Sequence, residues 1–298
     1  MPIHRKLSGA EIHAPFRWVV ADETERNAVS TNPDGTAISD TDGLHCQLYQ
    51  EDTGGVYVCT SSSPVTFTLV SGGSSSGGGL TQDTTVNIPA GSSLATIQAI
   101  FDAQPKNLNG YTLTMRFADG TYDFGTDGCL YPRAFYGGRL FVEGNPADGK
   151  VAHSTQAVRL KNTRTGDGGI LYFDYCEAEV AVRYIAFTTQ YAGWNHCLLF
   201  VYGNMSLAEG CYFECNNGTN GSGVWSAQAQ VRVQNCMFKT VDKCVGTDGG
   251  DVVLRNCTGD TNNYIAGAYG GYISLNTSLP SYTNALSTSG MGGQVWQS

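Results

Sequence analysis

Four similar segments recur in the second half of the chain, and they restrict the folds that it can adopt. They cover residues 180–187, 207–213, 231–238 and 252–258, and a weaker fifth copy covers residues 272–276. When Ile185, Cys211, Cys236 and Cys257 are taken as equivalent, successive copies are 26, 25 and 21 residues apart. This spacing is typical of solenoids, in which each repeat is one coil that buries its apolar side against its neighbours.

A second set of apolar residues repeats in the same region. Its members are Leu171, Leu199, Val224, Val245 and Ile265, at spacings of 28, 25, 21 and 20 residues. Within the copies, apolar and polar residues alternate with a period of two, which is the period of a β-strand. The sequence therefore predicts an all-β fold, a parallel β-helix whose equivalent residues stack about 4.8 Å apart from coil to coil.

Stacking of equivalent residues gives the cysteines a structural role. We expect Ile185, Cys211, Cys236 and Cys257 to form an interior column of small apolar side chains. Asn235 and Asn256 precede two of these cysteines, and we expect an amide ladder at a turn, where Asn tolerates a tight backbone. The chain has ten cysteines but no CxxC pair, and no metal site or cofactor is predicted from them.

The region before the repeats divides into three parts. Residues 1–70 form a predicted β-rich head module, in which a hairpin over residues 44–60 sets Cys46 opposite Cys59 either as a disulfide or, as we favour, as two neighbouring thiols. Residues 71–83 read as a Gly/Ser linker. Residues 84–276 form the predicted β-helix, and residues 277–298 a C-terminal cap or trimer contact.

One helix is predicted at the start of the β-helix. Over residues 94–103 the apolar residues fall on one face, Ser93 can cap the first turn, and Pro105 ends the segment. The first coil of a solenoid is an open sheet edge, so we expect this helix to cap it.

Composition and charge exclude several classes of partner. The 298 residues carry a net charge of −9, the wrong sign for a protein that binds phosphate backbones, so nucleic acid is not expected. The longest apolar stretch covers residues 197–202, far short of the roughly 20 residues that cross a bilayer. We expect neither membrane insertion nor a secretion signal.

Several stretches resemble proteins of tailed bacteriophages and prophages. Residues 97–102, 105–111, 119–122 and 137–144 (IQAIFD, PKNLNGY, DGTY and GGRLFVEG) resemble the capping helix and first coils of their pectin-lyase-like right-handed β-helix proteins. Residues 4–13, 20–22, 54–57 and 64–67 are similar to the short N-terminal module of tail-spike and tail-fibre proteins. The order of head, linker and capped β-helix is also the same.

The resemblance implies a homotrimeric virion appendage, a tail spike or tail fibre. Its N-terminal module would attach to a phage tail or baseplate protein, and its β-helix would face bacterial surface polysaccharide. The expected location is the virion tail, assembled in the host cytoplasm. No cofactor is implied.

Cleavage of a polysaccharide needs two carboxyl groups about 5 to 9.5 Å apart. If the protein is an endoglycosidase or lyase, the candidates are Glu209, Glu214 and Asp242. The positions stacked on Glu214 are Lys239 and Asp260, and those stacked on Glu209 are Gln234 and Arg255. Such alternation is typical of a solvated face that avoids stacking like charges, so we favour a structural role and commit to no catalytic residue.

Binding of a glycan requires aromatic faces and nearby polar groups. The candidates in or beside the expected inter-strand loops are Tyr191, Trp194, Tyr202, Asn217, Trp225 and Tyr264. The alternative is that half of these side chains pack in the interior or in a trimer interface. We therefore predict adsorption to a bacterial glycan, with depolymerisation and a purely structural adaptor as the two alternatives.

Overall fold

The computed structural model describes residues 18–39, 47–50, 55–62, 64–71, 79–149, 152, 154–163, 168–189, 195–203, 205–215, 221–276, 278–290 and 292–297. The chain divides into two compact units, Met1–Gly79 and Leu80–Ser298. Each unit has its own buried cluster of apolar residues.

The first unit contains a small sheet and a short helix. Its elements are β1 (Trp18–Val20), α1 (Glu23–Ala28), β2 (Gln47–Gln50), β3 (Gly55–Ser62) and β4 (Val65–Ser71), and the sheet order is β1-β2-β3-β4. The register Gln47↔Val58 agrees with the predicted hairpin, although Cys46 lies outside the described residues. Cys59 is buried, and its thiol donates a hydrogen bond to the Ser61 carbonyl.

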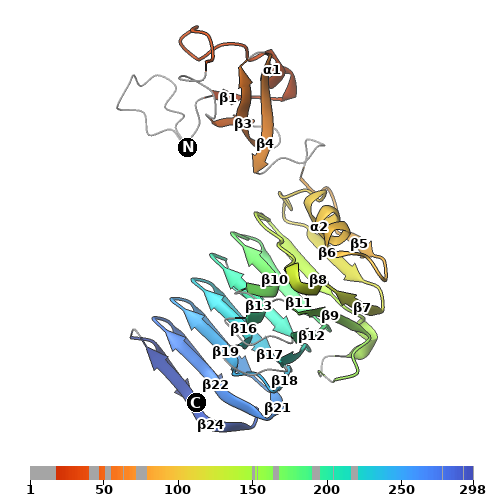
Figure 1. Cartoon of the computed structure of the whole chain (residues 1–298), viewed down its shortest axis with the longest axis vertical. Coiled ribbons are helices and arrows are strands. Elements are labelled where there is room, and N and C mark those ends of the chain that lie inside the picture. Colours follow the sequence, from red (N-terminus) through yellow and green to blue (C-terminus); the bar gives the residue numbers. More distant parts are fainter. Residues whose placement is uncertain are drawn as a thin grey trace. The chain divides into compact units, whose positions relative to one another are not determined.

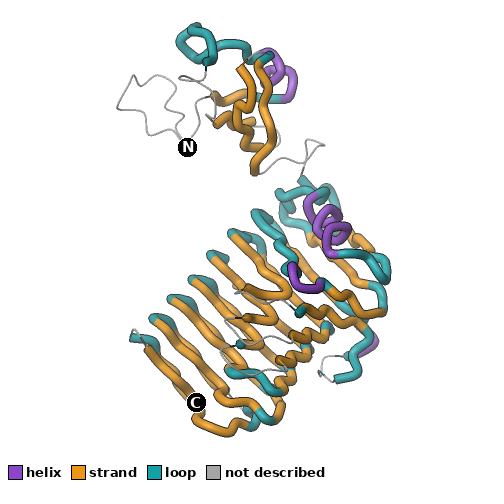
Figure 2. Tube along the Cα trace, viewed as in Figure 1, coloured by secondary structure: helices purple, strands orange, loops and turns teal. Residues whose placement is uncertain are grey.

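The second unit is built from three parallel sheets, and the chain passes through them in turn (Figures 1 and 2). The first sheet has nine strands in the described part of the chain. They are β5 (Thr84–Ile88), β6 (Thr112–Phe117), β8 (Arg139–Glu143), β11 (Glu179–Arg183), β14 (Met205–Glu209), β17 (Gln230–Gln234), β20 (Asp251–Arg255), β23 (Tyr272–Asn276) and β25 (Gln294–Gln297).

The other two sheets have six described strands each. The second sheet comprises β7 (Gly120–Asp123), β9 (Val158–Asn162), β12 (Ala186–Thr189), β15 (Tyr212–Cys215), β18 (Met237–Lys239) and β21 (Thr258–Asp260). The third comprises β10 (Gly168–Asp174), β13 (Asn195–Val201), β16 (Ser222–Ala227), β19 (Lys243–Asp248), β22 (Asn262–Tyr269) and β24 (Tyr282–Gly290). The prediction of a mostly β chain with parallel strands is confirmed.

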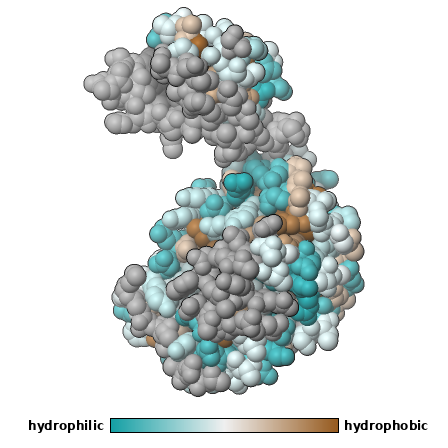
Figure 3. Space-filling view, viewed as in Figure 1, coloured by the Kyte–Doolittle hydropathy of each residue, from teal (hydrophilic) through white to brown (hydrophobic). Residues whose placement is uncertain are grey.

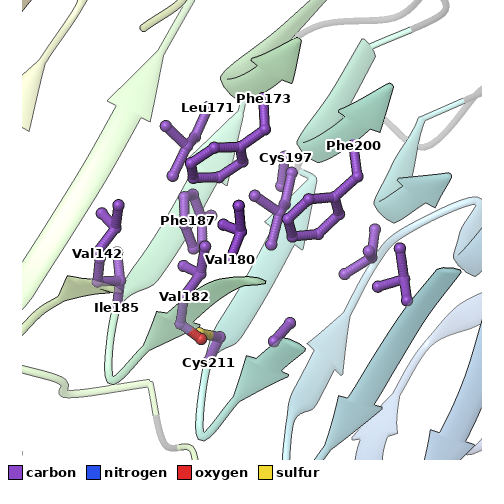
Figure 4. Packing of buried hydrophobic residues seen from close by; sticks show 14 of the residues in the cluster. Val142, Leu171, Phe173, Val180, Val182, Ile185, Phe187, Cys197, Phe200 and Cys211 are labelled. Carbon is purple, nitrogen blue, oxygen red and sulfur yellow. The ribbon is translucent and has the colours of Figure 1, made fainter. Parts of the chain in front are cut away.

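The core lies between the sheets and consists of columns of like residues. In the first sheet, Val142, Val182 and Ala208 pair in succession and are fully buried. In the second sheet, the rings of Phe187, Phe213 and Phe238 stack with centroids 5.3 and 5.0 Å apart. Figure 4 shows part of this packing, with Phe173 of the third sheet beside Phe200. Parallel strands in constant register produce such columns, because equivalent side chains then lie one strand spacing apart.

The predicted helix is present as α2 (Leu94–Asp102). The Ser93 side chain accepts a hydrogen bond from the Thr96 N–H, as a capping residue does. Ile97 and Phe101 are fully buried in the core of the second unit. Since β5 is the edge strand of the first sheet and directly precedes α2, the helix covers the core at that end (Figure 1). Two 3₁₀ turns follow, Gly125–Asp127 and Pro146–Asp148.

The predicted alignment of the second set of apolar residues, from Leu171 to Ile265, was wrong by one residue at two positions. Leu171 pairs with Leu198 rather than with Leu199, and Val245 pairs with Ala266 rather than with Ile265. In β13 and β22 two consecutive residues lie in the core, Cys197 beside Leu198 and Ile265 beside Ala266. Such a pair breaks the period of two, so apolar spacing alone cannot locate the partner.

Candidate functional site

The third sheet brings together the described members of the predicted aromatic set. Tyr202 directly follows β13, Trp225 lies within β16 and Tyr264 lies within β22. Tyr191, Trp194 and Asn217 lie outside the described residues. Leu198, Val224 and Val245 of this sheet face the core, so the next residue of each strand, such as Trp225, faces away from it. We name this outward side of β10, β13, β16, β19 and β22 the aromatic face.

Trp225 is the largest side chain on the aromatic face. Its ring stacks on the His196 ring with centroids 4.8 Å apart, and Tyr269 lies 5.8 Å from it on the other side. The indole crosses Gly246 of the next strand, where a Cβ atom would lie 2.3 Å from two ring carbons. Trp225 is only 8% exposed. Trp225 lies within β16 and the half-buried Tyr264 within β22, so neither lies in a loop, and the burial of Trp225 agrees with the alternative that some of these side chains pack in the interior.

Tyr202 forms an exposed pair with Tyr175, a residue that sequence reasoning missed. Tyr175 is 60% exposed and Tyr202 is 45% exposed. Their rings stack with centroids 4.8 Å apart and an interplanar angle of 19°. We name these two residues the tyrosine pair. The sequence signal that could have identified Tyr175 is that, like Tyr202, it directly follows a strand of the third sheet.

The backbone at the tyrosine pair is strained. Tyr175 and Tyr202 have φ angles of 50° and 49°, a left-handed conformation that costs a non-glycine residue roughly 1 to 2 kcal/mol. Gln228 and Gly249 occupy the same turn in the next two coils, because all four N–H groups donate to the last strand residue of the following coil. Gln228 also has a positive φ of 55°, so the turn takes a left-handed residue in each coil, and what distinguishes Tyr175 and Tyr202 is their exposed, stacked rings.

A buried polar column borders the aromatic face. His196, Ser222 and Lys243 occupy paired positions on β13, β16 and β19. Burial, with a smaller contribution from the Lys243 charge, lowers the pKa of His196 to about 3, so the imidazole is neutral. Among the described residues, His196 Nδ1 and Ser222 Oγ have no hydrogen-bond partner. Lys243 Nζ lies 2.5 Å from Asp242 Oδ2, and that carboxylate also accepts a hydrogen bond from Asn263.

The three candidate carboxylates lie in three different places of the coil. Glu209 ends β14 of the first sheet, Glu214 lies in β15 of the second, and Asp242 precedes β19 of the third. Each already has a cationic neighbour. Glu209 lies 3.5 Å from Arg183, Glu214 lies 3.9 Å from Lys239 and 4.0 Å from Arg159, and Asp242 contacts Lys243.

Glu209 belongs to an alternating column on the first sheet. Arg116, Glu143, Arg183 and Glu209 pair in succession, and Gln234 and Arg255 continue the column. Glu143 lies 2.9 Å from Arg116 and 3.5 Å from Arg183. Gln234 donates a hydrogen bond of 2.8 Å to Glu209. On the second sheet, Glu214, Lys239 and Asp260 pair in the same way. These contacts have the geometry of a structural column of charges.

The cysteine column is buried and in register. The pairs on either side of Ile185, Arg183↔Glu209 and Ala186↔Tyr212, place it opposite Cys211. The pairs on either side of Cys211 and of Cys236 likewise place Cys236 and Cys257 on the next two coils, and all four side chains are buried. The Cys236 thiol donates to the carbonyls of Gln234 and Ala208, and burial raises its pKa well above the usual value.

Asn235 and Asn256 share one turn position at the cysteine column. Their φ angles are 55° and 48°, and the Asn235 N–H donates to the Arg255 carbonyl. No group of three or more His, Cys, Asp or Glu side chains that could hold a metal ion is found in the described parts of the chain. In the same parts, no helix has the length and apolar character needed to span a membrane.

Comparisons with known proteins yield little. No protein-family model matches the chain, and no curated protein matches it. One solved structure with similarity is ORF18 of Geobacillus virus E2, at 12% sequence identity and a TM-score of 0.31, over 95% of this chain and 73% of that one. A TM-score of this size does not establish a common fold.

Proposed function

We propose that this chain is a tail spike or tail fibre of a tailed bacteriophage that binds bacterial surface polysaccharide, with a right-handed parallel β-helix as its second unit. The tyrosine pair carries the proposal of glycan binding. Its two rings stack on each other and present aromatic surface to solvent, being 60% and 45% exposed at Tyr175 and Tyr202. The sequence resemblance to phage appendage proteins and the coil-to-coil parallel pairing support the rest of the assignment.

The tyrosine pair has the chemistry that sugar rings require. The apolar face of a pyranose packs on an aromatic ring, while its hydroxyls need donors and acceptors close by. Gln228, at the same turn of the next coil, offers an amide about one strand spacing from Tyr202. Asp174 directly precedes Tyr175, and burial raises the pKa of its carboxyl. A saccharide that lies along the stack would thus meet two rings and then an amide.

Binding without cleavage is the function that we favour. A glycosidase holds one carboxyl group in its acid form and a second within about 5 to 9.5 Å of it. Glu209 ends a strand of the first sheet, Glu214 lies in a strand of the second, and Asp242 lies in the segment before β19 of the third; each of the three carboxylates already has a cationic side chain as a neighbour. This arrangement supports a binding appendage over a depolymerase.

The assembly is part of the proposal. We place the virion attachment to a tail or baseplate protein in the first unit and expect a homotrimer, as the sequence resemblance implies. The alternative is a structural adaptor with no glycan ligand, and the glycan experiment decides between the two.

The test measures retention and cleavage together. The full chain is passed over immobilised capsular polysaccharide and lipopolysaccharide from a panel of bacteria, and the eluate is assayed for new reducing ends. We expect retention on at least one glycan without release of reducing ends. The double variant Y175A/Y202A should lose at least tenfold in affinity, because it removes both rings.

A matched variant controls for nonspecific loss of an exposed tyrosine. Tyr272 is 56% exposed on β23 of the first sheet, outside the aromatic face, and Y272A should bind as the wild type does. Release of reducing ends would replace the proposal by depolymerisation. Absence of retention on the whole panel, or equal retention by Y175A/Y202A, would contradict glycan binding through the tyrosine pair.

A further inference from the structure

Asp174 lies beside two pairs of tyrosine rings on the aromatic face. It ends β10, and because Phe173 before it is buried in the core, Asp174 and Tyr172 point away from the core. Tyr175 of the tyrosine pair directly follows Asp174. The Tyr172 ring in turn contacts the Tyr131 ring edge to face, with centroids 5.0 Å apart. A carboxyl group therefore lies next to rings of both pairs.

The chain before β10 holds Tyr131 beside Tyr172. Arg133 forms a parallel bridge with Asp174, so this segment runs alongside β10. The Gln98 side chain of α2 donates a hydrogen bond to the Tyr131 carbonyl and accepts one from the Tyr131 N–H, at 3.1 and 2.9 Å. The aromatic surface thus continues from the tyrosine pair to the coil before it.

The Asp174 carboxyl is placed to receive a ligand. It is half-buried, and burial raises its pKa, while the charge of Arg133 acts in the opposite direction. Its carboxylate accepts no hydrogen bond from another described residue. Burial also raises the pKa of Tyr172, and the Asp174 charge adds to that shift, so the two groups are close. Carboxylate oxygens only accept hydrogen bonds, which suits hydroxyl groups of a sugar.

The third sheet has few cations for an acidic sugar. Lys243 is the one Lys or Arg in its described strands, and its ammonium already contacts Asp242. Arg133, in the segment that runs beside β10, acts on Asp174. The whole chain carries a net charge of −9. A uronic acid or phosphate group placed here would oppose a carboxylate, and like charges in contact are strongly unfavourable.

The described surface also favours a sugar over a protein as the ligand. A large exposed apolar patch is typical of a protein interface. Figure 3 shows small hydrophobic patches among hydrophilic residues on the described surface of one side of the second unit. Such a mixed surface suits a ligand that has both apolar ring faces and hydroxyl groups.

We infer that the glycan of the tyrosine pair is an uncharged polysaccharide, and that Asp174 selects it by accepting hydrogen bonds from its hydroxyl groups. The inference rests on the proposed function and adds the class of ligand to it. The tyrosine rings pack on the apolar faces of the sugars. The carboxylate rejects acidic sugars by repulsion, so attraction and exclusion both contribute to the choice of ligand.

The test compares two probes that differ in charge. One is a neutral polysaccharide, and the other is the same polysaccharide after oxidation of its primary hydroxyl groups to carboxylates. Isothermal titration calorimetry measures the affinity of the full-length protein for each. We expect the neutral form to bind at least tenfold more tightly than the oxidised form.

Two variants isolate the contribution of Asp174. D174N removes the charge but keeps the shape, and it should reduce the preference for the neutral form at least fivefold. Asp248 provides the matched control, because it is exposed, ends β19 of the same sheet and lies three strands away, about 14 Å. D248N should keep the preference of the wild type. A substitution that only lowers the folded fraction weakens binding of both probes alike and leaves their ratio unchanged.

The outcomes separate this inference from the proposed function. Equal or tighter binding of the oxidised form by the wild type would overturn the uncharged class, as would retention of acidic polysaccharides alone, while glycan binding through the tyrosine pair would stand. An unchanged preference in D174N, or an equal loss of preference in D248N, would overturn the role of Asp174. Absence of retention on every glycan would contradict the proposed function itself, and the inference with it.

Discussion

Phe213 is the best single position at which to test the coil-to-coil register. It is fully buried, and it is the middle ring of the stack that it forms with Phe187 and Phe238. Replacement by alanine removes a buried ring and leaves a cavity between two rings that the stacked strands hold in place. Phe→Ala changes of this kind cost about 3 to 5 kcal/mol.

The stacked register also predicts how the losses of unfolding free energy differ between Phe213 and Phe187. Phe213 has ring neighbours at 5.3 and 5.0 Å, whereas Phe187 has one ring neighbour in this stack. Each ring pair contributes about 0.5 to 1.5 kcal/mol beyond simple burial. We therefore expect F213A to lower the free energy of unfolding by about 5 kcal/mol and F187A by about 1 kcal/mol less.

Equilibrium unfolding in urea, followed by circular dichroism, measures both changes from the midpoint and slope of the transition. F213L keeps an apolar side chain and should recover more than half of the loss. A loss of less than about 2 kcal/mol for F213A, below the usual range for Phe→Ala, would refute the stacked register. So would a loss no larger than that of Y272A, which changes an exposed residue.

Two further predictions concern buried polar groups. The pKa of His196 lies at about 3 in the folded chain and near 6.5 when unfolded, so its contribution to stability is complete above pH 6.5 and is lost as the pH falls toward 3. H196Q should flatten the stability profile in that window, and an unchanged slope would show that the imidazole is solvated. C236S should lower stability by roughly 1 to 3 kcal/mol, because it buries a hydroxyl in an apolar column. Equal stability of C236S and the wild type in urea would mean that the column is open to water.

The aromatic face was only partly predictable from the sequence. Tyr202, Trp225 and Tyr264 were chosen for their residue type, and all three belong to one sheet or directly follow its strands. The three side chains differ in burial. Trp225 crosses Gly246 and stacks on His196, so it is buried, whereas Tyr202 is exposed. The sequence could not reveal this, since a glycine one coil away decides where the indole lies.

The carboxylates illustrate a second limit. Their alternation with basic residues was readable from spacing, and the paired positions Glu214, Lys239 and Asp260 agree with it. The places of Glu209 and Glu214 on two different sheets, and of Asp242 in the segment before β19, were not readable, because they depend on where each coil bends. The same bends place Cys197 and Leu198 together in the core and displaced the second apolar register by one residue.

The spacing of the repeats by itself determined the parallel β architecture and the column from Ile185 to Cys257, because strands of constant register place equivalent residues over one another. Residue type and a local cap likewise determined α2. Only the tertiary structure decided that Tyr175 stacks on Tyr202 and that Trp225 is buried. Those features arise from contacts between coils and from the side chains that cover each face, and neither is encoded in the period of a single strand.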